Sequence, residues 1–186
     1  YLTGHPPLAQ SFQARYAQAM NPQAFFVAKT LEMNQRHTKH ENTPYSLEPN
    51  CKESPGGLRD LQILLWVAKA AQLGDSWDAL ARQGMITDHE ARQLKRNEGL
   101  LSRIRIRLHL AAGRREDRLV FDLQAQVAKS LGMGLDAHGE FHARTGSERL
   151  MRDYYWAAKA VAQLNQIVLL NIQAWLKRDE SVEIQP

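Results

Sequence analysis

The residues best suited to chemistry gather in one short stretch of small residues and cations. Residues 48–60 read Glu-Pro-Asn-Cys-Lys-Glu-Ser-Pro-Gly-Gly-Leu-Arg-Asp. Gly56 and Gly57 would let a ligand approach the backbone closely, and a helix beginning after them points unpaired N–H groups at the same place. Lys52 and Arg59 add mobile cations. Together these are the parts of a phosphate-binding corner.

A second interpretation of residues 48–60 is a proline–glycine turn that binds no ligand. The G-x-x-x-x-G-K-[ST] spacing of a nucleotide-binding P-loop is absent. In this interpretation Asp60 lies in the first turn of the helix only to complement its dipole. The residues alone leave both interpretations open.

A cluster of arginines between residues 103 and 118 is the next candidate. One interpretation is an arginine-lined surface for phosphates or for an acidic partner domain. The other is a solvated helix face with local ion pairs, since Glu116 and Asp117 interrupt the run. Nucleic-acid binding is disfavoured because no aromatic residues interleave and no DNA-binding motif is present. The arginines are Arg103, Arg105, Arg107, Arg114, Arg115 and Arg118.

The other reactive side chains form no recognised catalytic set. His37 and His40, with Glu41 beside them, have a spacing that could hold a metal, but no third ligand can be named, so a solvated face is preferred. Cys51 has neither a second cysteine nor a clear His–Asn partnership. The aromatic residues 154–156 are interpreted as packing. Neither an Asp-x-Asp pair on a predicted strand nor a His-Asp doublet is found, so we assign no catalytic and no metal-binding residue.

Composition indicates a single globular domain. The chain has 186 residues, 44% of them apolar, and a formal net charge of +4, which suits one domain of ordinary composition. One cysteine excludes a disulfide framework. The absence of both a signal peptide and an apolar run of about 18 residues leads us to expect a cytoplasmic protein with no membrane partner. Because Tyr1 is not an initiator Met, we expect a piece excised from a longer chain.

Hydrophobic spacing and capping signals predict an all-α bundle of about seven helices, two of them long. We expect one domain over residues 1–186, with an irregular entry at 1–7, a Pro/Gly loop at 43–57 and a frayed tail at 178–186. The predicted helices are 8–20, 22–41, 58–73, 76–84, 87–112, 122–131 and 147–177, and residues 132–146 are expected to form a loop.

Residues 103–110 alternate strictly between polar and apolar side chains, which is typical of a strand. The helical template also fits, since Leu100, Ile104, Leu108 and Ala111 lie on one face. The capping box that begins at Thr87 and the absence of a turn signal before residue 112 favour a helix.

Several of these motifs resemble the family of the bifunctional PII uridylyltransferase/uridylyl-removing enzymes. The resemblance lies in residues 47–62 and 104–124, and also in 24–26, 34–37 and 154–165. A weaker form of the Lys52 to Asp60 motif occurs in the glutamine synthetase adenylyltransferases of the same superfamily. Two departures are visible, because Ser54 stands where the family commonly has glycine and Cys51 where it has a branched apolar residue.

The resemblance implies that this chain is the helical domain that follows a nucleotidyltransferase domain and precedes a His-Asp phosphohydrolase domain. The parent enzyme would move UMP from UTP to a tyrosine of the PII signal protein, with magnesium, and remove it under glutamine control. Both sets of catalytic carboxylates would lie outside this chain, which would be inactive alone and hold no cofactor. Lys52, Gly56, Gly57 and Arg59 would help to hold the UTP phosphates, and Arg103, Arg107, Arg114 and Arg115 would form an interdomain or anion surface.

Two other functions remain as alternatives to that implied role. The chain could be a purely structural spacer between domains, or a basic helical module that binds nucleic acid.

Overall fold

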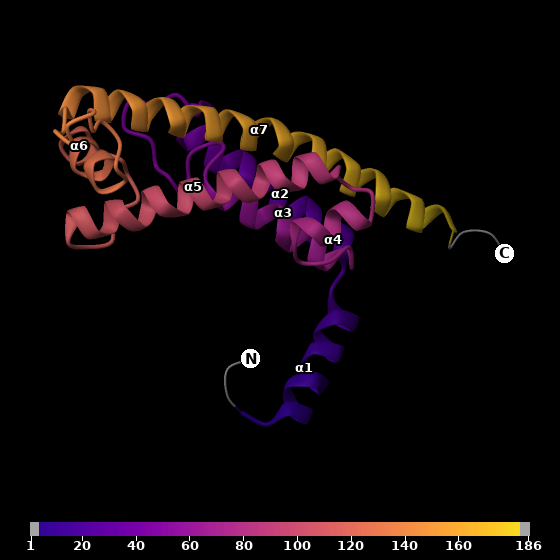
Figure 1. The fold of residues 1–186 in the computed structure, drawn as a ribbon. Coiled ribbons are helices and arrows are strands. Elements are labelled where there is room, and N and C mark those ends of the chain that lie inside the picture. Colours follow the sequence, from indigo (N-terminus) through magenta and orange to yellow (C-terminus); the bar gives the residue numbers. More distant parts are fainter. Residues whose placement is uncertain (1–3, 183–186) are drawn as a thin grey trace.

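The computed structural model describes residues 4–182, and over this range the chain forms seven helices and no sheet (Figure 1). The all-α bundle with two long helices is confirmed. The helices are α1 (Pro6–Ala19), α2 (Pro22–Lys39), α3 (Leu58–Ala70), α4 (Trp77–Arg82), α5 (Asp88–Ala112), α6 (Phe121–Ser130) and α7 (Ala143–Val182). None of the helices in residues 4–182 is long and apolar enough to cross a membrane.

Local capping explains where the clearest helices begin and end. The Oδ1 atom of Asn21 accepts a hydrogen bond from the backbone N–H of Ala24 at 2.9 Å, ahead of a proline in the first turn of α2. At the start of α5, the side chains of Thr87 and Glu90 each accept from the other's backbone N–H, which completes the capping box. The helix α5 is capped by Gly113, whose left-handed φ of 64° suits glycine.

The last helix is longer than the sequence predicts at both ends. It begins at Ala143, inside the predicted loop 132–146, and continues to Val182, inside the predicted tail 178–186; residues 183–186 lie outside the described range. Gly146 lies within α7 at a position where a side chain would not fit. A Cβ at this position would come within 2.9 Å of the Phe141 ring. Its glycine therefore marks close packing rather than a loop.

The remaining boundaries differ by smaller amounts. The first helix begins at Pro6, within the predicted entry 1–7, of which residues 1–3 lie outside the described range. The helix α3 ends at Ala70, three residues before the predicted end. The loop ahead of α3 matches its prediction closely, since no helix is present between Lys39 and Leu58.

The two long helices, α5 and α7, line a core that α3 also fills with fully buried side chains (Figure 1). Their inner faces repeat every three or four residues, as an amphipathic helix requires. The fully buried side chains on these faces are Leu94, Leu101, Ile104 and Leu108 on α5, and Leu150, Tyr154, Ala158, Val161, Val168 and Ile172 on α7. In Figure 1, α1 stands apart from the bundle that α2 to α7 form.

The ambiguous residues 103–110 are helical throughout. The alternation does not mark one buried face, because Ile104 and Leu108 are buried whereas Ile106 and Leu110 are exposed on another side of the helix. Arg105 turns toward the segment after α5, whereas Arg103 and Arg107 face solvent.

Candidate functional site

The loop that precedes α3 is closed by its own backbone. The N–H of Leu58 donates to the carbonyl of Cys51 at 3.1 Å, and the N–H of Arg59 donates to the carbonyl of Lys52 at 2.9 Å. The N–H of Asp60 donates to the carbonyl of Gly57, and the N–H of Gly57 donates to the carbonyl of Ser54. The expectation of unpaired N–H groups at this helix terminus is therefore wrong, and any anion at the corner must be held by side chains.

The two glycines are needed for contact with the protein's own backbone. Gly56 has a φ of +77°, and a Cβ there would overlap the carbonyl oxygen of Ala158 on α7. A Cβ on Gly57 would lie 2.8 Å from the carbonyl oxygens of Lys52 and Ser54. Both glycines are buried. The absence of a side chain at these two glycines therefore lets the backbone of α7 and of the loop itself come close to them.

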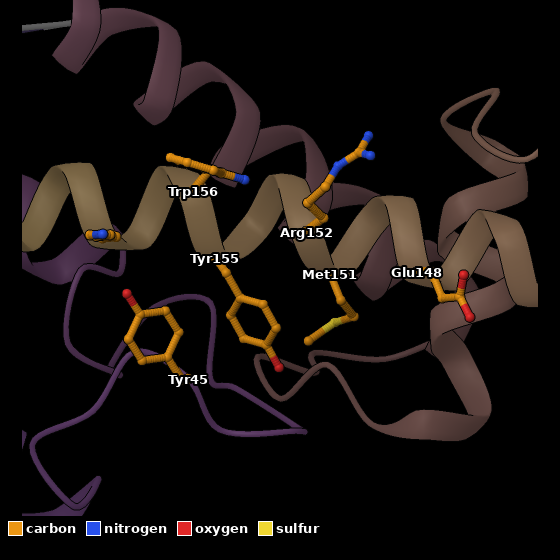
Figure 2. A pocket seen from close by; sticks show the side chains of 7 residues that line it. Tyr45, Glu148, Met151, Arg152, Tyr155 and Trp156 are labelled. Atoms are coloured by element: carbon orange, nitrogen blue, oxygen red, sulfur yellow. The ribbon is translucent and has the colours of Figure 1, made fainter.

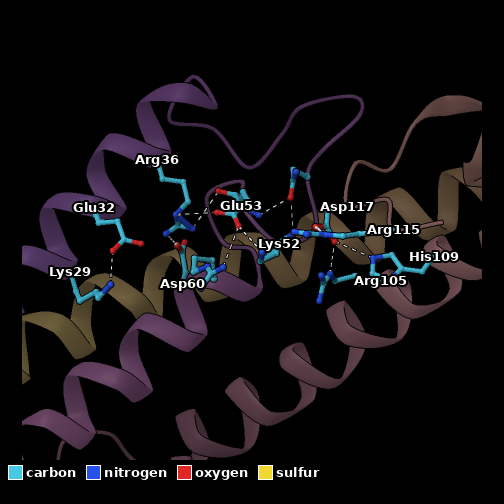
Figure 3. Close-up of polar contacts among 12 residues, drawn as sticks. Lys29, Glu32, Arg36, Lys52, Glu53, Asp60, Arg105, His109, Arg115 and Asp117 are labelled. Atoms are coloured by element: carbon cyan, nitrogen blue, oxygen red, sulfur yellow. Dashed lines mark hydrogen bonds and ion pairs between the residues drawn. The ribbon is translucent and has the colours of Figure 1, made fainter. Parts of the chain in front are cut away.

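Asp60 is a fully buried centre of this arrangement (Figure 3). Its Oδ1 accepts a hydrogen bond from Nη2 of Arg36 at 2.6 Å, and Nε2 of His37 lies 2.9 Å from the same oxygen. Its Oδ2 accepts from the backbone N–H of Gly56 at 2.7 Å. A carboxylate with three such partners does more than complement a helix dipole, because it joins α2 to the loop and to α3.

His37, in the last turn of α2, and His40, which follows the helix, have different surroundings. His37 is half-buried against Asp60, so its interpretation as part of a solvated face is wrong. Burial lowers the pKa of His40, and the charge of Arg36 acts in the same direction while Glu53 opposes it. Among residues 4–182, no group of three or more His, Cys, Asp and Glu side chains could hold a metal ion.

Three cationic side chains lie around Glu53, and we call Glu53, Lys52, Arg59 and Arg36 the Glu53 cluster. Figure 3 labels Glu53, Lys52 and Arg36. Its Oε1 lies 3.2 Å from Nζ of Lys52 and 3.6 Å from Nη2 of Arg59. Its Oε2 lies 3.8 Å from Nε of Arg36. The structure therefore brings together Lys52 and Arg59, as the sequence predicts, and adds Arg36, which sequence reasoning missed.

The Glu53 cluster is open to solvent on one side. The side chains of Lys52, Arg59 and Glu53 keep 16%, 23% and 30% of their area exposed. A groove of about 300 Å³ lies beside them, lined by Glu32, Gln35, Arg36, Lys39, His40 and Glu53. The groove lining balances two permanent cations, Arg36 and Lys39, with the carboxylates of Glu32 and Glu53. Any anionic group would therefore be held by Lys52 and Arg59 at the edge of the cluster.

Arg59 is further held by an aromatic ring. Its guanidinium carbon lies 5.3 Å from the centre of the Trp66 ring, and Nζ of Lys29 lies 5.6 Å from the same centre. Cations over an aromatic face are attracted by its electrons. Trp66 thus orients Arg59 without neutralising its charge.

The arginine cluster of residues 103–118 divides into paired and unpaired members. Oδ1 of Asp117 accepts from Nε of Arg105 at 2.5 Å, and Oδ2 of Asp117 lies 3.6 Å from Nε of Arg115. Further ion pairs join Arg114 to Glu116 and Arg118 to Glu48. Arg103 and Arg107 are exposed and make no ion pair with any described residue. The local ion pairs of the second interpretation are therefore present. Arg103 and Arg107 are the two arginines of this cluster whose charges remain available for a surface contact.

The pKa of Asp117 is lowered by the two basic side chains that contact its Oδ1. Burial raises the pKa of this carboxyl, but hydrogen bonds from Arg105 and His109 and their charges outweigh it and lower the pKa. Asp117 also anchors the loop before α3, because its carbonyl accepts from the N–H of Cys51 at 2.8 Å.

A larger groove of about 440 Å³ lies between α7 and the loop that holds Tyr45 (Figure 2). The rings of Tyr45 and Tyr155 are 5.7 Å apart, and the hydroxyl of Tyr155 donates to the carbonyl of Ser46. Trp156 keeps 68% of its area exposed, so its interpretation as packing is wrong, whereas Tyr154 is buried. Three consecutive residues of a helix point in three different directions, so the sequence already indicated that residues 154–156 could not all face the core.

Comparison with known proteins decides the family. Residues 24–169 match the family model described as GlnD PII-uridylyltransferase. This chain belongs to that family. The match includes the loop before α3, the Glu53 cluster and most of α7, so the family resemblance of these motifs is confirmed.

Curated relatives in the family support the same assignment. A bifunctional uridylyltransferase/uridylyl-removing enzyme of Cupriavidus pinatubonensis is 56% identical over 97% of this chain. One of the same name from Burkholderia mallei is 57% identical over 94% of the chain. The chain spans about a fifth of the length of these relatives, since it covers 20% of each. No solved structure matches.

Proposed function

We propose that this chain is the helical domain of a bifunctional uridylyltransferase/uridylyl-removing enzyme, in which it packs on a nucleotidyltransferase domain and helps to hold the UTP phosphates. In this proposal the parent enzyme acts in the cytoplasm, uses magnesium and modifies the PII signal protein. Lys52 and Arg59 bind phosphate oxygens and move no proton, which is how cations act in nucleotidyl transfer.

The observation that carries the proposal is the convergence of Lys52, Arg59 and Arg36 on the single carboxylate of Glu53. Arg36 is also paired with the buried Asp60, so three cations face two carboxylates and leave one net positive charge, at the partly exposed Lys52 and Arg59. An incoming phosphate can replace Glu53 as their partner and accept hydrogen bonds from Arg59 at two points. These surroundings fit a nucleotide phosphate and do not fit a divalent cation.

The buried anchor below the cluster supports the same function. Asp60 holds Arg36 on α2 and the N–H of Gly56, so the cluster sits on a loop that is fixed from both sides. Fixed cations lose little freedom when they bind an anion. A spacer with no ligand would need the buried anchor but not the exposed surplus of cations, and a nucleic-acid module would need a longer basic track than this corner offers.

The test is Arg59→Ala in the full-length enzyme, with uridylyl transfer and uridylyl removal measured separately. A charge-assisted hydrogen bond is worth about 1.5–3 kcal/mol, so kcat/KM for UTP should fall by about 10- to 100-fold. Uridylyl removal should be nearly unchanged. Lys29→Ala is the matched control, because Lys29 also lies over Trp66 but belongs to α2 and contacts Glu32.

Equal losses of both activities in Arg59→Ala, together with a lower melting temperature, would contradict the proposal and favour the spacer. Steep salt-dependent binding of DNA by the full-length enzyme, weakened by the same substitution, would favour the nucleic-acid module.

A further inference from the structure

One face of α5 carries a row of exposed arginines. Arg92, Arg96, Arg103 and Arg107 are all exposed, and we call them the arginine ridge. At 3.6 residues per turn they fall within an arc of roughly 60°, and at 1.5 Å per residue they extend over about 22 Å. The ridge is therefore one continuous surface along the helix rather than a scatter of charges.

The ridge has no internal counter-charge. Between Arg92 and Arg107 the sequence holds one acidic residue, Glu98, and its carboxylate accepts the indole N–H of Trp77 at 2.8 Å. None of the four arginines makes an ion pair with any residue of the described range. This contrasts with Arg105, which leaves α5 in another direction and is paired with Asp117. Four unneutralised guanidinium groups on one face attract an acidic surface.

Two large apolar side chains lie on the same face. Ile106 is 58% exposed and Leu110 is 68% exposed, and both fall within about 60° of the ridge. Apolar side chains surrounded by arginines are typical of a protein interface, whose core is apolar and enriched in arginine. A site for single-stranded nucleic acid would instead call for aromatic side chains among the cations, and none lies on this arc.

We propose that the arginine ridge with Ile106 and Leu110 is a docking surface for an acidic, apolar-centred face of another domain of the same full-length polypeptide. The proposal rests on the part of the proposed function that makes this chain one domain of a larger enzyme. Charge complementarity calls for an acidic occupant. The occupant is a domain of the same polypeptide because four fifths of each relative lies outside the matched region. It is independent of whether Lys52 and Arg59 bind phosphate.

The test places a reporter cysteine at the end of the ridge in the full-length enzyme. Leu110→Cys is labelled with a maleimide, and mass spectrometry of the peptide that contains residue 110 gives the labelling rate. The rate for the folded enzyme is compared with the rate for the enzyme unfolded in urea. Cys51 does not interfere because it is fully buried. We expect slow labelling of the folded enzyme, and labelling at least about tenfold faster when Arg103→Glu and Arg107→Glu place like charges at the interface.

Arg149→Glu with Lys159→Glu is the matched control, because both residues are exposed on α7 and the charge change is the same. This pair should leave the labelling rate unchanged. Uridylyl removal and the melting temperature report that each variant is folded.

Each other outcome overturns the proposal. Fast labelling of the folded enzyme before charge reversal means that the face is open. Slow labelling that charge reversal does not change means that the occupant is not acidic. Faster labelling after nuclease treatment identifies a nucleic acid, and faster labelling on dilution identifies a separate protein chain. Because the readout is labelling, a failure here is distinct from a failure of the Arg59→Ala test.

Discussion

Asp60 and Arg36 form a buried ion pair between α3 and α2, with Oδ1 of the aspartate 2.6 Å from Nη2 of the arginine. The Asp60 side chain is completely buried and the Arg36 side chain is 10% exposed. Removing one partner of such a pair leaves a buried charge without compensation, which costs far more than the loss of a surface contact. The pair therefore ties the loop before α3 to α2.

We predict that Asp60→Ala destabilises the chain by about 3–5 kcal/mol, because it removes the buried carboxylate that pairs with Arg36 at 2.6 Å and leaves the N–H of Gly56 without its acceptor. Asp122→Ala is the control, since Asp122 is an exposed acidic residue in the first turn of α6. A residue that only complements the helix dipole contributes about 0.3–1 kcal/mol. Chemical denaturation measures both variants. Similar small losses in the two would show that the buried pair contributes little.

We predict that Gly56→Ala is severely destabilising, by at least about 3 kcal/mol, because the added methyl group meets the backbone of Ala158 and the φ of +77° disfavours a side chain. Gly113→Ala separates the two effects. Its φ is +64° but no atom lies within 4 Å of the position that a methyl group would take, so it should cost about 1–2 kcal/mol. Thermal unfolding of both variants provides the measurement, and equal costs would mean that α7 can move away.

We predict that Glu53→Gln in the full-length enzyme lowers the KM for UTP by about two- to fivefold. The substitution removes the carboxylate that competes with phosphate for Lys52 and Arg59, and a partly exposed ion pair is worth up to about 1 kcal/mol. The opposite sign distinguishes this variant from general damage to the site. Steady-state kinetics of uridylyl transfer tests it, and a raised KM would show that Glu53 itself contacts the substrate.

We predict that the stability contributed by Asp117 is lost in acid. Its folded-state pKa is lowered, so its contribution is fully present above the unfolded value of about 3.9 and disappears as the pH falls through the folded value. Asp117→Asn should therefore cost about 1–2 kcal/mol at neutral pH, and the difference from the unaltered chain should shrink below about pH 4. Denaturation at several pH values measures this difference.

The control for that experiment is Asp75→Asn. Asp75 is 72% exposed and its nearest ion pair, to Lys69, is at 4.0 Å. Its substitution should change stability by less than about 0.5 kcal/mol at neutral pH. A loss for Asp117→Asn that stayed constant down to about pH 2, below the ordinary range of an aspartate pKa, would show that the ionised carboxylate is not what stabilises the segment after α5.

The sequence by itself determined the features that depend on neighbours along the chain. The start of α5 at Thr87 and its end at Gly113 follow from side chains that bond within one turn and from one backbone angle. The period of the buried residues on α5 and α7 predicts the all-α bundle, because each stripe needs another to cover it. The motifs around Lys52 and Arg59 were sufficient to indicate the family.

Only the tertiary structure decided what those motifs contact. The partner of Asp60 lies 24 residues away on α2, and the group that excludes a side chain at Gly56 belongs to α7. Likewise, four arginines of α5 form one exposed face while Arg105 is paired behind it. Spacing along a helix states which side chains share a face, but whether that face meets protein or solvent depends on how separate helices pack, which no local pattern encodes.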